Sequence, residues 1–146
     1  MTSAPSSEVW TLAHLDVGPS AIAGRGLFAG APIAPGELVM RLGGRLVDTA
    51  ELDALIGSAN AEGRYVDSVT VEGDIHLVLP EGTVAHFANH SCEPNLVHDG
   101  PYDVCARRDI AAGEELTIDY GTNSGAPGFE MRCACGAAMC RGLITS

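Results

Sequence analysis

The sequence predicts a mostly β domain of many short strands with little helix, closed at its end by a small metal-binding segment. Three observations predict this fold class. The chain has 146 residues, including 18 Gly and 8 Pro, a composition typical of frequent turns. Short runs of alternating apolar and polar residues recur between these turns. Finally, three of the five Cys lie together in residues 133–140. At this length one domain is expected.

In the first third of the chain, alternation predicts a strand over residues 9–17. Residues 20–30 form a Gly-punctuated turn that leads into a short apolar strand, and residues 31–37 form another turn. Residues 37–48 alternate again and predict a strand with a bulge or bend at the adjacent glycines, Gly43 and Gly44.

The clear helix signal lies at residues 48–58. Asp48 or Thr49 can cap its amino end. An apolar face at spacings i, i+3 and i+4 follows, formed by Leu52, Leu55 and Ile56.

The remaining elements are predicted in the same way. Two strands around Glu72-Gly73-Asp74 predict a hairpin over residues 64–80, and a second hairpin-like pair covers residues 95–110. Between them, residues 83–92 predict a short helix or a turn. A turn and a short strand at residues 111–121, then a linker at residues 122–128, lead to the Cys-rich end.

Charge and hydropathy exclude some classes of function. The formal net charge is −11, from 8 Lys and Arg against 19 Asp and Glu. Such a field repels phosphate backbones, so direct nucleic-acid binding is not expected, whereas a basic peptide would be attracted. No apolar run is long enough to span a bilayer. Residues 1–8 resemble no secretory signal and are expected to be a disordered tail, so we expect a cytoplasmic protein.

The Cys-rich end points to a metal. Cys133, Cys135 and Cys140 have the spacing C-x-C-x4-C, and structural zinc takes four tetrahedral sulfur or nitrogen ligands. The fourth ligand must come from elsewhere, and Cys92, Cys105 or a His are the candidates. An odd number of Cys fits metal ligation better than a disulfide framework.

A dense polar stretch, HFANHSCEPNL at residues 86–96, raises the question of what it holds: a ligand, a metal or only its own side chains. Three motifs now occur in order: GRGLFA at residues 24–29, NHSCEPN at residues 89–95, and GEELTIDYG at residues 113–121 followed by the Cys-rich end. Together they resemble the SET-domain protein lysine methyltransferases with a post-SET zinc segment. The resemblance covers roughly residues 10–144.

The resemblance implies a SET domain at residues 9–121 and a post-SET zinc segment at residues 129–146. It implies small sheets around a knot-like crossing of the chain, with one short helical insert. S-adenosylmethionine (SAM) is then expected on one side, with the substrate lysine entering a narrow channel from the other.

Site residues follow by position in the motifs. Those matching the cofactor-binding positions of the family are Gly24, Arg25, Gly26, Asn89, His90 and Phe129. Cys92 matches the ligand that completes a zinc site with Cys133, Cys135 and Cys140. Tyr120 matches the tyrosine of the methyl-transfer channel, and Tyr65 lies where the family often places a tyrosine lining the lysine pocket.

Two positions depart from the family pattern. His86 stands where an Arg is common, and Ile118 stands where Phe or Tyr is usual, which leaves the number of added methyl groups open. Of the other residues, Cys105 is predicted to be a buried core thiol, while Glu114 and Glu115 are predicted to be solvated turn residues.

The leading hypothesis is a SAM-dependent lysine N-methyltransferase acting on a basic protein or peptide. A free amino acid or small amine is the alternative substrate, and a catalytically weak peptide-binding module is the alternative class. The enzyme must bring a neutral amine to the cofactor, and deprotonating a free lysine at pH 7 costs about 4 to 5 kcal/mol. Tyr120 is expected to align that amine without acting as a strong base. The sequence leaves the oligomeric state open.

Overall fold

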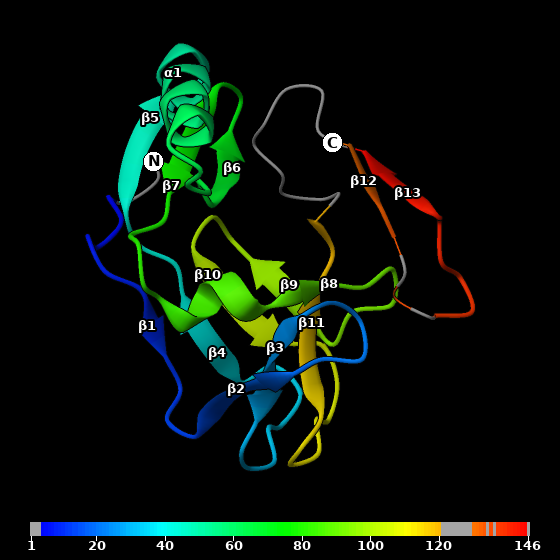
Figure 1. The fold of residues 1–146 in the computed structure, drawn as a ribbon. Coiled ribbons are helices and arrows are strands. Elements are labelled where there is room, and N and C mark those ends of the chain that lie inside the picture. Colours follow the sequence, from blue (N-terminus) through cyan, green and yellow to red (C-terminus); the bar gives the residue numbers. More distant parts are fainter. Residues whose placement is uncertain (1–3, 121–129, 134, 136, 146) are drawn as a thin grey trace.

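The computed structural model describes residues 4–120, 130–133, 135 and 137–145. Within them the chain forms several small sheets, one α-helix and one 3-10 helix (Figure 1). One four-stranded sheet has the order β1 (Trp10–Thr11), β4 (Leu38–Arg41), β10 (Asp103–Ala106), β9 (Leu96–Asp99). The second has the order β2 (Leu15–Pro19), β3 (Arg25–Ala29), β11 (Glu115–Ile118), β8 (Asn89–His90).

Two smaller sheets complete the fold. A three-stranded sheet has the order β5 (Arg45–Asp48), β7 (Ile75–Val78), β6 (Ser68–Glu72), and α1 (Thr49–Ala61) packs against β5 and β7. The strands β12 (Glu130–Arg132) and β13 (Leu143–Thr145) form a separate hairpin, drawn beyond β8 in Figure 1. The mostly β fold class is therefore confirmed.

Several predicted elements are also confirmed. Strands β6 and β7 pair as an antiparallel hairpin, as do β9 and β10. The helix begins after Asp48, whose side chain accepts a hydrogen bond from the backbone N–H of Glu51 at 2.8 Å. Leu52 is fully buried beneath it. The segment predicted as a short helix or turn contains the 3-10 helix η1 (Val84–Phe87).

Two predicted strands are each divided in the structure. Residues 9–17 become β1 and the start of β2, with His14 between them at a positive φ of 64°. Residues 37–48 become β4 and β5, which belong to different sheets rather than to one bent strand. The division falls at Gly43 and Gly44, where the chain crosses from one sheet to the other.

Gly44 is required at this crossing, because its φ is 142° and a Cβ atom there would overlap the carbonyl oxygen of Val78. We expect Gly44→Ala to lower the free energy of unfolding by about 2 kcal/mol or more. Urea unfolding measures this change. Gly57→Ala is the matched control, since Gly57 lies in α1 with open space around its Cα. Because Ala favours helix, that variant should gain roughly 0.5–1 kcal/mol. Equal stability of the two variants would contradict the steric argument.

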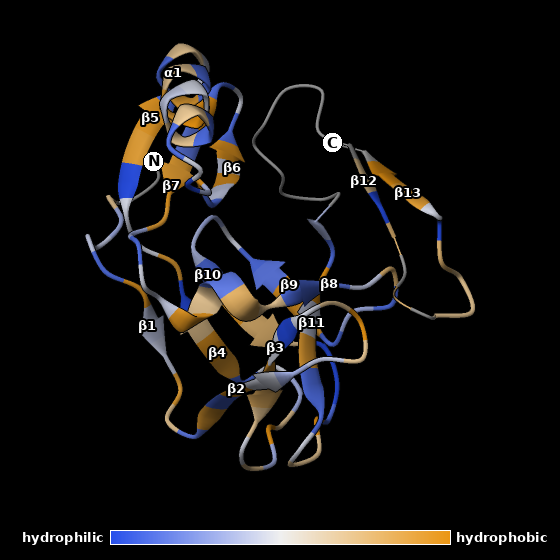
Figure 2. Ribbon diagram, in the orientation of Figure 1, coloured by the Kyte–Doolittle hydropathy of each residue, from blue (hydrophilic) through white to orange (hydrophobic). Residues whose placement is uncertain are grey.

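The core lies between the two four-stranded sheets and beneath η1. Strands β4 and β11 contain apolar residues (Figure 2), and Leu27, Val39 and Leu116 are fully buried in this core. Cys105 is buried as well, which raises the pKa of its thiol and confirms it as a core residue. None of the described helices has the length and apolar character needed to cross a membrane.

Candidate active site and metal centre

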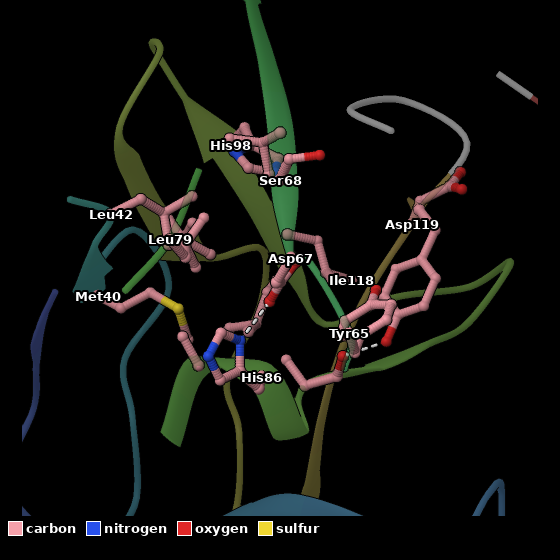
Figure 3. A pocket seen from close by; sticks show the side chains of 16 residues that line it. Met40, Leu42, Tyr65, Asp67, Ser68, Leu79, His86, His98, Ile118 and Asp119 are labelled. Atoms are coloured by element: carbon pink, nitrogen blue, oxygen red, sulfur yellow. Dashed lines mark hydrogen bonds and ion pairs between the residues drawn. The ribbon is translucent and has the colours of Figure 1, made fainter. Parts of the chain in front are cut away.

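A pocket of about 110 Å³ opens between β6, β9, η1 and the end of β11 (Figure 3). Its walls are mainly apolar, contributed by residues such as Met40, Leu42, Leu79 and Val104. The polar groups in the walls are the side chains of Tyr65, Asp67, Ser68, His86, His98, Asp119 and Tyr120. A pocket of this kind can strip water from the apolar stem of an entering side chain while offering polar contacts at fixed points.

Tyr120 is fixed in this pocket by its hydroxyl. The hydroxyl donates a hydrogen bond to the carbonyl oxygen of Ala88 at 2.6 Å. Burial, together with the nearby ionisable groups of Tyr65, Asp67 and Glu115, raises the pKa of Tyr120 above its ordinary value. The phenol therefore stays protonated at neutral pH, so it can orient a substrate but is a poor base.

Tyr65 lines the same pocket, although 77% of its surface is exposed. Because most of its surface is exposed, Tyr65 lies at the rim of the pocket rather than in its interior. The structure thus brings both predicted catalytic tyrosines to one pocket. Tyr120 lies inside it and Tyr65 lies near its opening.

The predicted cofactor residues also lie together. The side-chain amide of Asn89 is 3.1 Å from the carbonyl oxygens of both Ala23 and Arg25, so Asn89 packs against the turn that contains Gly24 and Gly26. A Cβ at Gly26 would displace the carboxylate of Glu115 from its present position, while Gly24 faces open space at a φ of 42°. Phe129 lies outside the described residues.

His90 connects Tyr120 to the Cys-rich end. The backbone N–H of Tyr120 donates to His90 Nδ1 at 3.0 Å, so this nitrogen carries no proton and the ring N–H is on Nε2. Nε2 then donates to Cys92 Sγ at 3.4 Å. Burial lowers the pKa of His90, in keeping with a neutral ring, even though Asp119 Oδ1 lies 3.6 Å from Nδ1.

Four thiols form a cluster that can hold one metal ion. The sulfur atoms of Cys92, Cys133, Cys135 and Cys140 all lie within 4.8 Å of one another. Cys92 Sγ and Cys133 Sγ are 3.8 Å apart, which matches the sulfur–sulfur edge of about 3.8 Å in a tetrahedron with zinc–sulfur bonds of about 2.3 Å. Hydrogen bonds from the backbone of Cys92 and Ala137 lower the pKa of Cys135 to about 6, and zinc requires the thiolate.

Arg141 ties this cluster to the pocket. Its backbone N–H and Nε donate to Cys92 Sγ at 3.3 and 3.4 Å, and its Nη2 donates to Asp119 Oδ1 at 2.6 Å. Asp119 lines the pocket next to Tyr120. Sequence reasoning gave Arg141 no role, because its partners are 22 and 49 positions away along the chain.

The prediction that Glu114 and Glu115 are solvated turn residues is wrong. Glu114 accepts hydrogen bonds from Arg108 and from the buried Asn95, and the Arg108 guanidinium lowers the pKa of Glu114 to about 2. Glu115 lies in β11 and accepts from the Ser20 hydroxyl at 2.8 Å. Asn95 and Ser20 lie 19 and 95 positions before Glu114 and Glu115, so these two contacts could not be read from the turn.

Asn95 is a further residue whose role only the structure shows. It is 2% exposed, and its side chain accepts from the backbone N–H of Thr117 and donates to the carbonyl oxygen of Glu115. Residues 89–95 are thereby held along β11, beginning with the parallel pairing of β8 and β11.

Comparison with known proteins finds one family model and several relatives that match most of the chain. The SET domain family model matches residues 24–121, more than half of the chain. The histone-lysine N-methyltransferase ATX2 of Arabidopsis thaliana is 34% identical over 142 residues, covering 90% of this chain and 13% of that protein. Histone-lysine N-methyltransferase 2B of Homo sapiens is 35% identical over 138 residues, covering 86% of this chain and 5% of that protein.

A third relative is the H3 lysine-4 specific histone-lysine N-methyltransferase of Schizosaccharomyces pombe, 34% identical over 146 residues. The match covers 90% of this chain and 15% of that protein, so the chain spans only a small part of the length of each of these relatives. The family match runs through the glycine turn, the polar stretch and Tyr120, which include part of the pocket and most of the residues predicted to bind the cofactor. The chain belongs to the SET domain family.

Proposed function

We propose that this chain is a SAM-dependent lysine N-methyltransferase that acts on a protein or peptide. One observation carries the proposal: residues 88–90 link the pocket to the glycine turn. Ala88 accepts the hydroxyl of Tyr120 on the pocket side, and the next residue, Asn89, binds the carbonyl groups around Gly24. A lysine in the pocket and a methyl donor on the glycine turn would therefore meet at one short segment.

The residues of the glycine turn fit the methionine end of SAM. Asn89 Nδ2 has two N–H groups but four acceptors within 3.1 Å, namely Ser20 Oγ, Ala23 O, Arg25 O and Glu115 Oε2. At least two of these four oxygen atoms can therefore accept hydrogen bonds from an incoming ammonium group, such as the one SAM carries. Gly24, Arg25, Gly26, Asn89 and His90 are the described residues that would hold the cofactor.

When bound, SAM supplies a methyl group already activated on a sulfonium. The protein must then position a neutral amine and exclude water, which is a matter of proximity and orientation. The apolar walls of the pocket disfavour the charged ammonium and so lower its pKa. Tyr120, protonated and fixed on Ala88, sets the position of the amine from one side.

We also propose that the four-thiol cluster holds structural zinc. Cys92, Cys133, Cys135 and Cys140 supply four sulfur ligands, a closed set with no open position for catalysis. The metal would hold the β12–β13 hairpin against Cys92 and, through His90, beside Tyr120.

A basic protein segment is the proposed substrate. Three relatives are named as histone-lysine methyltransferases, and the formal net charge of −11 would attract a histone-like tail. A free amino acid remains the competing substrate.

The test is transfer of labelled methyl from SAM to a lysate of the source organism, separated into macromolecular and small-molecule fractions. The protein is loaded with zinc beforehand. We expect label on protein lysines. Label confined to small molecules would replace the protein substrate with a free amine, and SAM binding without label in either fraction would argue for a binding module.

A further inference from the structure

His86 forms an unusual contact pair inside the pocket. Its Nδ1 lies 2.7 Å from Asp67 Oδ2 (Figure 3). Its Nε2 lies 2.9 Å from the carbonyl oxygen of Pro80. Both partners are acceptors, and a neutral imidazole has only one N–H to donate. Both contacts are satisfied only when both ring nitrogens carry a proton, so the geometry calls for a positively charged His86.

The surroundings favour the same state. The hydrogen bond that His86 donates to Asp67 is the largest influence raising the pKa of His86, and Glu81 adds to it. The other titratable side chains of the pocket do not oppose this charge: burial lowers the pKa of His98, the tyrosines are uncharged phenols at neutral pH, and Asp119 is an acidic group paired with Arg141. His86 and Asp67 therefore form an ion pair, with side chains 24% and 22% exposed.

The backbone holds both members of the pair in place. Asp67 immediately precedes β6, and its carbonyl oxygen accepts from the N–H of Leu79 at 3.0 Å. His86 lies in η1, whose amino end is capped by the Thr83 side chain. Of the two carboxylate oxygens of Asp67, only Oδ2 accepts a hydrogen bond from the described residues, so Oδ1 is left to interact with a group that enters the pocket.

The pair lies within reach of the proposed reaction centre. Asp67 lines the same pocket as Tyr65 and Tyr120, and its charge is one of the influences that raise the pKa of Tyr120. In Figure 3 its carboxylate points to His86, with Tyr65 and Ile118 on the other side.

We propose that Asp67 binds the amine of the substrate lysine and that His86 positions Asp67 and offsets its charge. This inference rests on the proposed function for the identity of the substrate, and it adds a residue that the tyrosine-lined channel of the family does not imply. Asp67 is the binding residue, and His86 is the positioning residue.

The offset matters because transfer needs a neutral amine. A bare carboxylate beside an ammonium raises the pKa of that ammonium by about 1–3 units and would keep it protonated. A carboxylate paired with an imidazolium still accepts a hydrogen bond from the amine N–H. Because the two charges of the pair largely cancel, the pair has little effect on the pKa of the amine. The pair therefore recognises the amine without holding its proton.

Binding tests the role of Asp67 without turnover. The probes are two degenerate hexapeptide libraries, one with a central lysine and one with a central norleucine, which has no amine. We expect the wild-type protein to prefer the lysine library and Asp67→Asn to reduce that preference about tenfold or more, the scale of a hydrogen bond to a charged group. Asp53→Asn, on the exposed face of α1, makes the same change in net charge and should keep the preference.

The pH profile of kcat tests the role of His86, since its acid limb reports groups in the enzyme–substrate complex. Asp67→Asn should move the acid limb to lower pH, because the amine loses a negative neighbour. His86→Gln should move it to higher pH by about one unit or more, because Asp67 is left uncompensated. His86→Arg, which restores a permanent cation with several donors, should return the limb to the wild-type position.

The acid limb of kcat should move in opposite directions in Asp67→Asn and His86→Gln. If the two residues had only a structural role, both variants would lose stability and their acid limbs would not move in opposite directions. An unchanged lysine preference in Asp67→Asn, or no binding of either library to the wild type, overturns the proposal. A lysine preference that disappears in Asp67→Asn, without any methyl transfer by the wild type, supports the binding role while refuting the proposed activity.

Discussion

Tyr120→Phe is expected to lower kcat for methyl transfer by about 100-fold or more, because a small displacement of a reacting group has consequences of that size. The hydroxyl is fixed on Ala88 at 2.6 Å, one residue before Asn89, so it lies between the proposed lysine pocket and the proposed cofactor turn. The measurement is single-turnover transfer of labelled methyl from SAM. SAM affinity, measured by calorimetry, should stay close to the wild-type value, because Phe retains the ring beside His90.

Tyr102→Phe is the matched control. The Tyr102 hydroxyl is buried and has no hydrogen-bond partner among the described residues, and Tyr102 does not line the pocket. Removing that hydroxyl should leave kcat unchanged and leave stability unchanged or slightly higher, since an unsatisfied polar group is removed from the interior. If Tyr120→Phe turned over substrate as fast as Tyr102→Phe, Tyr120 would have no part in catalysis.

Local sequence patterns predicted the local elements of this fold. Two hairpins follow from alternation and turn residues, and the helix follows from Asp48 and an apolar face at helical spacing. The same patterns could not show that residues 37–48 belong to two sheets, because Gly43 and Gly44 read equally as a bend or as a crossing. The steric requirement at Gly44 comes from Val78, which is distant in sequence.

In the candidate site, too, local patterns predicted nearby features but not contacts between residues distant in sequence. The spacing of Cys133, Cys135 and Cys140 predicted a metal, but the spacing alone left Cys92, Cys105 and a His open as the fourth ligand. The structure brings Cys92 to the cluster and buries Cys105 in the core. No local pattern marks the pair of Asp67 and His86, because it joins a strand end to a 3-10 helix 19 positions away. Contacts of this kind depend on tertiary packing.

Removing the metal is expected to lower the rate of methyl transfer strongly while leaving the core folded. Zinc would fix Cys92, which accepts from His90 Nε2, while His90 Nδ1 accepts from the backbone N–H of Tyr120. Arg141 makes a second connection, from Cys92 to Asp119 in the pocket. Loss of zinc should therefore disturb the position of Tyr120 as well as the β12–β13 hairpin. We expect activity to fall by about 100-fold or more after chelation and in Cys135→Ala, since groups that support a metal site commonly change activity by 10- to 100-fold.

The experiment combines zinc content, methyl transfer and limited proteolysis. Cys135→Ala should lose zinc and become sensitive to cleavage within residues 130–145, because ordering of that segment would depend on the metal. Cooperative unfolding of the core should persist, because residues such as Leu27 and Leu116 are buried in other sheets. Cys105→Ala is the control, since it removes a thiol of the core and should retain zinc. Full activity after complete removal of zinc would show that the hydrogen bonds of His90 and Arg141 hold the pocket together without a metal.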